Sequence, residues 1–268
     1  MDRTLYLHDN ILRAVRLPDS LINPGEQHFP EHELTGMKAE SLVDLCDGTV
    51  TGHEFLSLLP AGVSSERFFQ QQSAPALAEL FLLQLLLSED LTEGRRFLNL
   101  PVRVLVRPAL CAVLCARHLD GVEVEIQDPE NLCGLNLSRL NDLRHNLQGF
   151  RRAGAGIYAD DVSPALMQGL SVLDLPLCGL KVSRQQFQQQ CEENPPVPLR
   201  VGARADPAYV YVAEGIETAA QSLLAALLGF THGQGWLWPA REWHFVRGNR
   251  GTRHGIANKE SNRCAKYK

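Results

Sequence analysis

Short apolar runs alternate with longer helix-like segments through most of this 268-residue chain. The short runs have the length and composition typical of strands, and the longer ones have the spacing typical of helices. Strand-like runs lie at residues 41–45, 50–56, 97–100, 122–126, 156–159, 178–182, 199–202 and 210–213, and helix-like segments include residues 74–87, 135–152 and 218–228. This alternation predicts a parallel α/β fold. Because one α/β barrel needs roughly 250 residues, we expect a single TIM-type (β/α) barrel.

The two ends of the chain depart from this pattern. Pro18, Pro24 and Pro30 interrupt residues 1–36, so we expect an N-terminal extension in which any helix is short. Residues 37–242 are expected to form the barrel domain. Residues 243–268 are rich in Gly, Asn, Arg and Lys and predict a basic, disordered tail. A solvated tail and a contact with an acidic partner both fit that composition.

The charge distribution argues against binding to duplex nucleic acid. The formal net charge is −5, although residues 241–268 carry eight Lys or Arg against two Asp or Glu. The rest of the chain is therefore distinctly acidic, whereas a protein that coats nucleic acid needs a basic surface. An acidic body suits a site whose carboxylates hold metal cations.

The apolar segments predict neither a membrane span nor a secretory signal. The longest of them, residues 77–87, contains Glu79 and Gln84 and is too short to cross a bilayer. Polar residues 8–10 interrupt the first apolar run, unlike a signal peptide. We interpret residues 77–87 as part of a buried helix.

The cysteines fit a reducing compartment. The chain has seven, an odd number scattered along its length, and none form two pairs at zinc-finger spacing. Cys111 and Cys115 lie four residues apart in an apolar stretch, which places them on one helix face as buried thiols. We therefore expect a cytoplasmic protein.

Polar side chains recur at the carboxyl ends of the predicted strands. They are Glu54, Asn99, Glu125, Asp160, Asp161, Lys181 and Glu214. In a parallel barrel these strand ends meet at one face. Carboxylates gathered there repel one another unless cations intervene, and oxygen ligands suit Mg²⁺ or Mn²⁺. Sites with two such ions are suited to attack on phosphate esters.

Each of these residues also has a simpler interpretation when it is taken alone. A single Glu at a strand end is usually a solvated rim residue, and Lys181 could form a rim salt bridge. The Asp160–Asp161 pair could be a helix N-cap. The prediction of a metal site depends on the recurrence of polar residues at successive strand ends.

Several segments, in the same order along the chain, resemble the EAL-domain family. Residues 212–239, VAEGIETAAQSLLAALLGFTHGQGWLWP, resemble the family's AEG(V/I)ET run, helix and QG-aromatic-Pro signature. Residues 160–184 resemble its DDFGTG…LKIDR segment, and residues 54–56 (EFL) stand where the family has its EAL triplet. FLNLP and EVEIQD are similar to its NLSP and EITE motifs. The resemblance covers about residues 40–240.

This resemblance implies hydrolysis of the bacterial messenger cyclic-di-GMP to linear pGpG by a metal-activated water. It implies two Mg²⁺ or Mn²⁺ ions. One would be held by Glu54, Asn99, Glu125 and Asp160, and the second partly by Asp161. Lys181 would orient or polarise the attacking water, and Glu214 would be an acidic group at the metal centre. The implied supporting residues are Asp128, Glu217 and Gln234.

The chain also departs from the family pattern. Leu58 replaces an Arg that pairs with a substrate phosphate, and a leucine cannot supply a cationic fork. Asp128 replaces the second Glu of EITE, and Ser183 the Asp of LKID. Residues 162–168 contain Pro164 and no glycine where the family has FGTGYSS, which indicates a stiffer loop.

Two functional interpretations therefore stay open. The retained ligand set, Lys181 and Glu214 favour an enzyme. Leu58 and the altered loop at residues 162–168 favour a catalytically weak or inactive EAL module that binds cyclic-di-GMP or a regulatory protein partner. A homodimer is a candidate assembly in both cases.

Overall fold

The structure is a computed structural model that describes residues 3–8, 12–17, 30, 33–192 and 209–246. Its strands belong to one sheet in the order β10-β9-β8-β7-β6-β5-β4-β3-β11-β1-β2. The sheet closes on itself because β10 also pairs with β3, with Gly233 opposite Val43. Neighbouring strands from β4 to β10 are parallel, and β3 is antiparallel to both β4 and β10. The predicted TIM-type barrel is confirmed.

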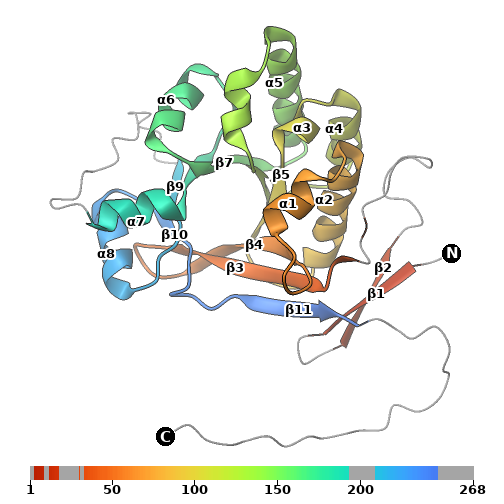
Figure 1. Ribbon diagram of the computed structural model, residues 1–268, viewed down its shortest axis with the longest axis horizontal. Helices are drawn as coiled ribbons and strands as arrows, with labels where there is room; N and C mark the ends of the chain where they lie inside the picture. The colour runs from red at the N-terminus through yellow and green to blue at the C-terminus, as the bar shows by residue number, and fades with distance from the viewer. Residues whose placement is uncertain (1–2, 9–11, 18–29, 31–32, 193–208, 247–268) are drawn as a thin grey trace, which may run out of the picture.

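Figure 1 shows the helices arranged around the outside of the barrel strands. The strands are β1 Arg3–His8, β2 Leu12–Leu17, β3 Gly36–Asp44, β4 Val50–Leu58, β5 Arg95–Leu100, β6 Val122–Ile126, β7 Gly156–Val162, β8 Gly179–Val182, β9 Val210–Ala213, β10 His232–Gly233 and β11 Arg241–Phe245. The helices are α1 Ser65–Gln70, α2 Ala74–Ser88, α3 Val102–Leu105, α4 Pro108–Cys115, α5 Leu137–Arg152, α6 Pro164–Val172, α7 Arg184–Glu192, α8 Ala219–Leu227 and the 3₁₀ helix η2 Pro129–Gly134.

Polar caps define where several helices begin. The side chains of Ser73, Asn136 and Ser163 each accept a hydrogen bond from a backbone N–H in the first turn of α2, α5 and α6. Thr218 and Gln221 form a capping box at α8. Such caps satisfy N–H groups that have no partner inside the helix. Helix α2 is buried along almost all of its length, as its apolar sequence predicts.

The barrel interior contains an apolar layer beneath a polar one. Leu42, Phe97, Tyr158 and Val212 come from the alternate strands β3, β5, β7 and β9 and form a buried cluster apart from the main core. The Phe97 and Tyr158 rings meet edge to face, with their centroids 5.1 Å apart. Because strand residues two apart share a face, the next inward residues along these strands lie directly above this layer.

Both ends of the described chain add strands to the barrel sheet. β11 pairs with β3, where Trp243 lies opposite Met37, and with β1, where Phe245 lies opposite Leu7. β1 and β2 form an antiparallel hairpin. The described parts of residues 1–36 are thus mainly strands, and the expected domain boundary at residue 242 falls inside β11. Trp243 is fully buried.

Some expectations concern segments that the structure does not describe. The strand-like run at residues 199–202 and the expected disorder of residues 247–268 both lie outside the described residues. Within the described part of the chain, no helix combines the length and the apolar character needed to cross a membrane.

Candidate metal centre and nucleotide pocket

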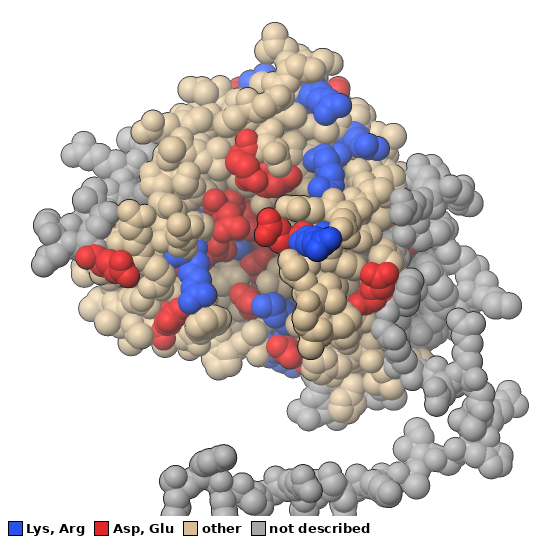
Figure 2. Space-filling view, viewed as in Figure 1, with Lys and Arg blue, Asp and Glu red and all other residues tan. Residues whose placement is uncertain are grey.

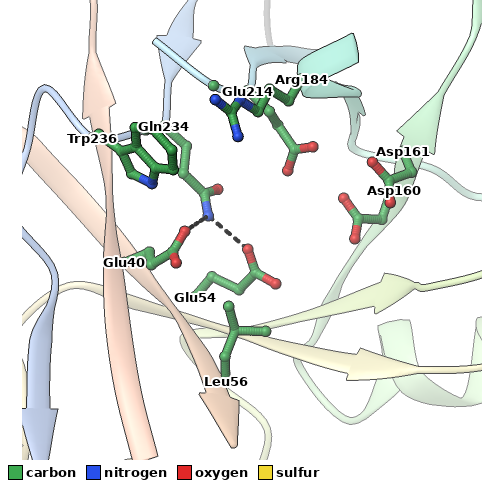
Figure 3. A pocket seen from close by; sticks show the side chains of 11 residues that line it. Glu40, Glu54, Leu56, Asp160, Asp161, Arg184, Glu214, Gln234 and Trp236 are labelled. Carbon is green, nitrogen blue, oxygen red and sulfur yellow. Dashed lines mark hydrogen bonds between the residues drawn. The ribbon is translucent and has the colours of Figure 1, made fainter. Parts of the chain in front are cut away.

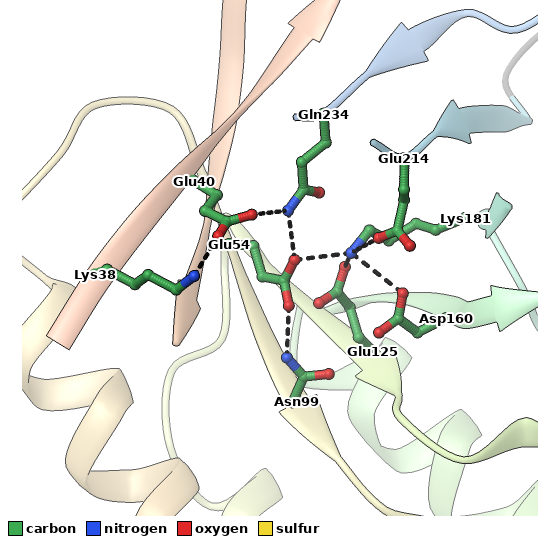
Figure 4. A network of polar contacts seen from close by, with 9 residues as sticks. All are labelled: Lys38, Glu40, Glu54, Asn99, Glu125, Asp160, Lys181, Glu214 and Gln234. Atoms are coloured by element: carbon green, nitrogen blue, oxygen red, sulfur yellow. Dashed lines mark hydrogen bonds and ion pairs between the residues drawn. The ribbon is translucent and has the colours of Figure 1, made fainter. Parts of the chain in front are cut away.

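The upper layers of the barrel interior consist of polar side chains from successive strands. β4, β6 and β8 supply Glu54, Glu125 and Lys181, and Gln234 directly follows β10. The alternate strands supply a further set two residues above the apolar layer, namely Glu40, Asn99, Asp160 and Glu214. This arrangement of four side chains from alternate strands is the usual way in which a TIM barrel fills its interior. Figure 4 shows four of the carboxylates around Lys181, with Asn99 and Gln234 in contact with Glu54.

Lys181 lies at the centre of this polar cluster and is fully buried. Its Nζ lies 2.8 Å from Glu54 Oε2 and 2.7 Å from Glu214 Oε1. The same atom lies 3.1 Å from Glu125 Oε1 and 3.2 Å from Asp160 Oδ1. One ammonium group therefore contacts four carboxylates on four different strands or strand ends (Figure 4).

Glu54 is the most completely bonded of these carboxylates. Its Oε1 accepts a hydrogen bond from Asn99 Nδ2 at 2.8 Å, and its Oε2 accepts one from Gln234 Nε2 at 2.7 Å. Gln234 Nε2 also donates to Glu40 Oε2 at 3.1 Å, and Lys38 donates to the other oxygen of Glu40. The network thus runs from the centre of the barrel to β3.

This network holds Glu54 and Lys181 in their charged forms. Burial alone would raise the pKa of Glu54, but the charge of Lys181 and the donated hydrogen bonds lower it to about 2. Burial alone would lower the pKa of Lys181, but the surrounding carboxylates outweigh burial and raise it. The two residues form a buried ion pair across the barrel.

The other three carboxylates in contact with Lys181 are harder to ionise. Burial, together with the charge of Glu54, raises the pKa of Glu125 well above its ordinary value. Burial and neighbouring carboxylates raise the pKa of Asp160 to about 6, even though Lys181 opposes the shift. Burial likewise raises the pKa of Glu214. Without a further cation, these groups tend to retain protons.

The donor set fits a hard divalent cation. Glu54, Glu125 and Asp160 each offer an oxygen, and these three atoms lie within 4.8 Å of one another. The buried atoms Asn99 Oδ1 and Glu125 Oε2 accept no hydrogen bond from any described residue. Buried oxygens of this kind usually have a partner, and carboxylate and amide oxygens are the ligands that Mg²⁺ and Mn²⁺ prefer.

Asp160 and Asp161 both line one pocket although they are consecutive in the sequence. In a regular strand their side chains would face opposite sides. The register of β7 shifts between Ala159 and Val162, and Asp161 has φ of 50°. Aspartate tolerates this left-handed conformation better than most residues. The bulge turns Asp161 toward the cavity (Figure 3).

Two of the predicted supporting residues lie away from the cluster. Asp128 Oδ1 accepts a hydrogen bond from the backbone N of Val102, and its Oδ2 accepts one from Asn131, so it fixes the start of α3. Glu217 pairs with Arg184 at the rim. Gln234, the third, is part of the network through Glu54.

The acidic groups open into a pocket of about 250 Å³. Its lining consists of Glu40, Glu54, Leu56, Asp160, Asp161, Arg184, Glu214, Gly215, Gln234, Gly235 and Trp236. Figure 2 shows the acidic side chains in the hollow at the centre of this face. Three of these residues, Glu40, Arg184 and Trp236, are not among the site residues predicted from the sequence. Glu40 could have been found because it lies two residues before the interior residue Leu42 on the same strand.

A second cavity of about 370 Å³ adjoins the first on the side of β4. It shares Leu56 with the acidic pocket and includes Asn99 in its wall. Leu58 lines this second cavity beside apolar side chains such as Val63 and Phe69. The position that departs from the family pattern therefore borders the apolar cavity.

The comparisons with known proteins identify the fold. No protein-family model matches the sequence, and no curated protein matches it. Among solved structures, the cyclic-di-GMP-bound EAL domain of FimX from Pseudomonas aeruginosa aligns with a TM-score of 0.63 and 15% identity, over 79% of this chain and 92% of that one. Klebsiella pneumoniae BlrP1, in a complex with manganese and cyclic-di-GMP, aligns with a TM-score of 0.62 and 21% identity, over 85% of this chain and 64% of that one.

The cAMP-bound EAL enzyme Bd1971 gives a TM-score of 0.58 and 18% identity, over 77% of this chain and 63% of that one. The chain thus spans less than two thirds of the length of Bd1971 and of BlrP1. The class of fold is a (β/α) barrel with an antiparallel strand at its closure. More particularly, this chain has the fold of EAL domains, as the sequence resemblance predicts.

Proposed function

We propose that this chain hydrolyses cyclic-di-GMP to linear pGpG in the acidic pocket. The observation that carries the proposal is the set of buried oxygens of Glu54, Asn99, Glu125 and Asp160 at the mouth of a barrel with the EAL fold, among which Asn99 Oδ1 and Glu125 Oε2 accept no hydrogen bond from a described residue. The manganese and cyclic-di-GMP complex of BlrP1, which has a similar fold, supports the choice of ligand and of cofactor.

In this proposal Glu54, Asn99, Glu125 and Asp160 hold one Mg²⁺ or Mn²⁺ ion, and Asp161 helps to hold a second. When bound, such ions stabilise charge on a phosphoryl group and make a bound water more acidic. Asp161 belongs to this set because its bulge turns it toward the same pocket as Asp160.

Lys181 and Glu214 would perform the remaining steps. Lys181 is charged and lies directly beneath the pocket, from where it would orient the attacking water and offset the charge of the carboxylates. Glu214 has a raised pKa and can accept the proton of that water on a carboxylate oxygen. Addition of water breaks one phosphodiester bond, and the proton passes to the leaving sugar oxygen.

Product analysis tests this proposal. Purified protein is incubated with cyclic-di-GMP and either Mg²⁺ or Mn²⁺, and the nucleotides are separated by chromatography. The proposal predicts pGpG in the presence of either ion and none when the ions are chelated. Intact nucleotide after prolonged incubation at high protein concentration would contradict hydrolysis.

A second candidate function is a module that binds cyclic-di-GMP, or a protein partner, without turnover. Two observations favour it. Leu58 borders an apolar cavity and supplies no cation. Only Ser163 separates the end of β7 from the start of α6 at Pro164, which leaves no flexible loop beside Asp161. Nucleotide binding with no pGpG formed would select this candidate.

A further inference from the structure

The acidic pocket needs a cation if it is to receive a phosphate group. Its lining includes the carboxylates of Glu40, Glu54, Asp160, Asp161 and Glu214. Fixed negative charges repel a phosphodiester, and the proposed metal ions face only the part of the ligand that reacts. A second contact to the anion must therefore come from another positive group at the wall.

Arg184 is the only Lys or Arg among the described residues that line this pocket. Lys181 lies beneath it, fully buried and in contact with four carboxylates. Lys38 lines the neighbouring cavity and pairs with Glu40. Arg184 is the first residue of α7 and directly follows Ser183 at the end of β8.

The guanidinium of Arg184 is held at the mouth of the pocket by three neighbours. Its Cζ lies 4.3 Å from the centre of the Trp236 ring, a cation–π contact. One of its terminal nitrogens donates to Glu217 Oε1. Its aliphatic part passes so close to Gly215 that a Cβ there would overlap it. Figure 3 shows the guanidinium between Trp236 and Glu214 at the edge of the cavity.

These three contacts leave the guanidinium accessible to solvent. The side chain of Arg184 is 52% exposed, and Trp236 is 72% exposed. An arginine whose only role was to join β8 to the segment after β9 would stabilise the fold most if it were buried. An arginine that is fixed in direction and still open to solvent is suited to bind an incoming anion, because little rotamer freedom is lost when it binds.

We propose that Arg184 contacts a phosphate of the bound nucleotide, whereas position 58 offers no guanidinium. This inference rests on the proposed function. Arg184 lies on the β8 side of the pocket, whereas Leu58 ends β4, so the phosphate is held from a different wall. Glu217 keeps the guanidinium in place before the ligand arrives.

Equilibrium titration with cyclic-di-GMP tests this inference. The titration is carried out with Ca²⁺ as the divalent ion, and chromatography verifies that the cyclic-di-GMP stays intact during the measurement. Arg184→Gln should weaken binding about tenfold to a hundredfold, the usual range for loss of one charge-assisted hydrogen bond. Arg184→Lys should restore part of the loss because it keeps the charge without the fork. The salt dependence of binding should be weaker in Arg184→Gln than in the wild type.

Arg139→Gln provides the matched control. Arg139 is exposed near the start of α5 and does not line the pocket, so this variant changes the net charge equally and should bind like the wild type. Circular dichroism verifies that each variant is folded. If the wild type binds and the affinity of Arg184→Gln is within twofold of the wild-type value, the inference is overturned. An equal loss of affinity in Arg139→Gln would also overturn it. Absence of wild-type binding would instead overturn the proposed function on which it rests.

Discussion

Lys181 Nζ on β8 lies 2.8 Å from Glu54 Oε2 on β4, so these two strands are joined through the interior of the barrel. In a metal-free protein this ammonium is the only cation among the described residues that contacts Glu54, Glu125, Asp160 and Glu214 together. It limits the repulsion that four close carboxylates would otherwise produce.

Lys181→Met should therefore lower the stability of the metal-free protein. Removing one partner of a buried ion pair costs about 3–5 kcal/mol, and part of this loss should be recovered when Mg²⁺ is added. Thermal unfolding with chelator and with Mg²⁺ measures both effects. Lys38→Met is the control, because its pair with Glu40 is partly exposed and should contribute about 1 kcal/mol or less. Equal effects of the two substitutions would contradict the central role of Lys181.

The raised pKa values predict that pH affects stability and metal binding in opposite directions. The pKa of Asp160 is about 6 in the folded protein, and those of Glu125 and Glu214 are also raised. The folded state therefore holds more protons than the unfolded state. The stabilisation from these groups is complete below their unfolded pKa values, near 4, and is lost as pH rises through 6 and above.

Metal binding should become tighter over the same interval, because the ligands must lose their protons. Titration with Mn²⁺ at pH 5, 6 and 7.5 measures the affinity, and denaturant unfolding in chelator measures the stability. We expect affinity to rise and metal-free stability to fall between pH 5 and 7.5. A constant affinity across this range would show that Asp160 and its neighbours are not ligands.

Leu58→Arg should tighten cyclic-di-GMP binding. Leu58 follows Glu54 and Leu56 at two-residue spacing on β4, so all three share the inward face. A charge-assisted hydrogen bond to phosphate contributes roughly 1.5–3 kcal/mol, or about one to two decades in affinity. Leu137→Arg, at a 79% exposed position on α5, controls for the added charge. Unchanged affinity in Leu58→Arg would mean that position 58 does not face the phosphate.

Gly179→Ala should destabilise the barrel without touching the acidic layer. A Cβ at Gly179 would lie 2.5 Å from both Tyr158 Cε1 and Val210 O. Backbone and a buried ring must move to admit it, which costs about 1–3 kcal/mol. Gly134→Ala is the control, since nothing lies within 4 Å of a Cβ there. The midpoint of urea unfolding should be lower for Gly179→Ala than for Gly134→Ala. Similar midpoints for the two variants would show that the interior layer is loosely packed.

The sequence predicted the fold, and it predicted for the same physical reason that the candidate site residues lie close together. Strand alternation places Glu54, Asn99, Glu125 and Lys181 on inward faces, near the carboxyl ends of their strands. Once the strands are recognised, their carboxyl ends must meet at one face.

The remaining features depend on contacts that the sequence does not reveal. β10 has only two residues, so its closure against β3 has no pattern of its own. β11 lies within the basic C-terminal composition and is defined by its partners β3 and β1. The inward turn of Asp161 comes from a bulge, which a strict two-residue alternation does not predict. Arg184 is held at the pocket by its contacts with Trp236, Gly215 and Glu217, which its position in the sequence does not reveal.

The most direct test of the account compares pGpG formation by the wild type and by Glu54→Ala. Glu54 receives hydrogen bonds from Asn99 and Gln234 and an ion pair from Lys181, so the variant must first be shown to be folded by circular dichroism. We predict that the wild type releases pGpG from cyclic-di-GMP with Mn²⁺ or Mg²⁺, and that folded Glu54→Ala releases none. Full turnover in the folded variant, or turnover that persists in chelator, would contradict a metal-dependent reaction centred on Glu54.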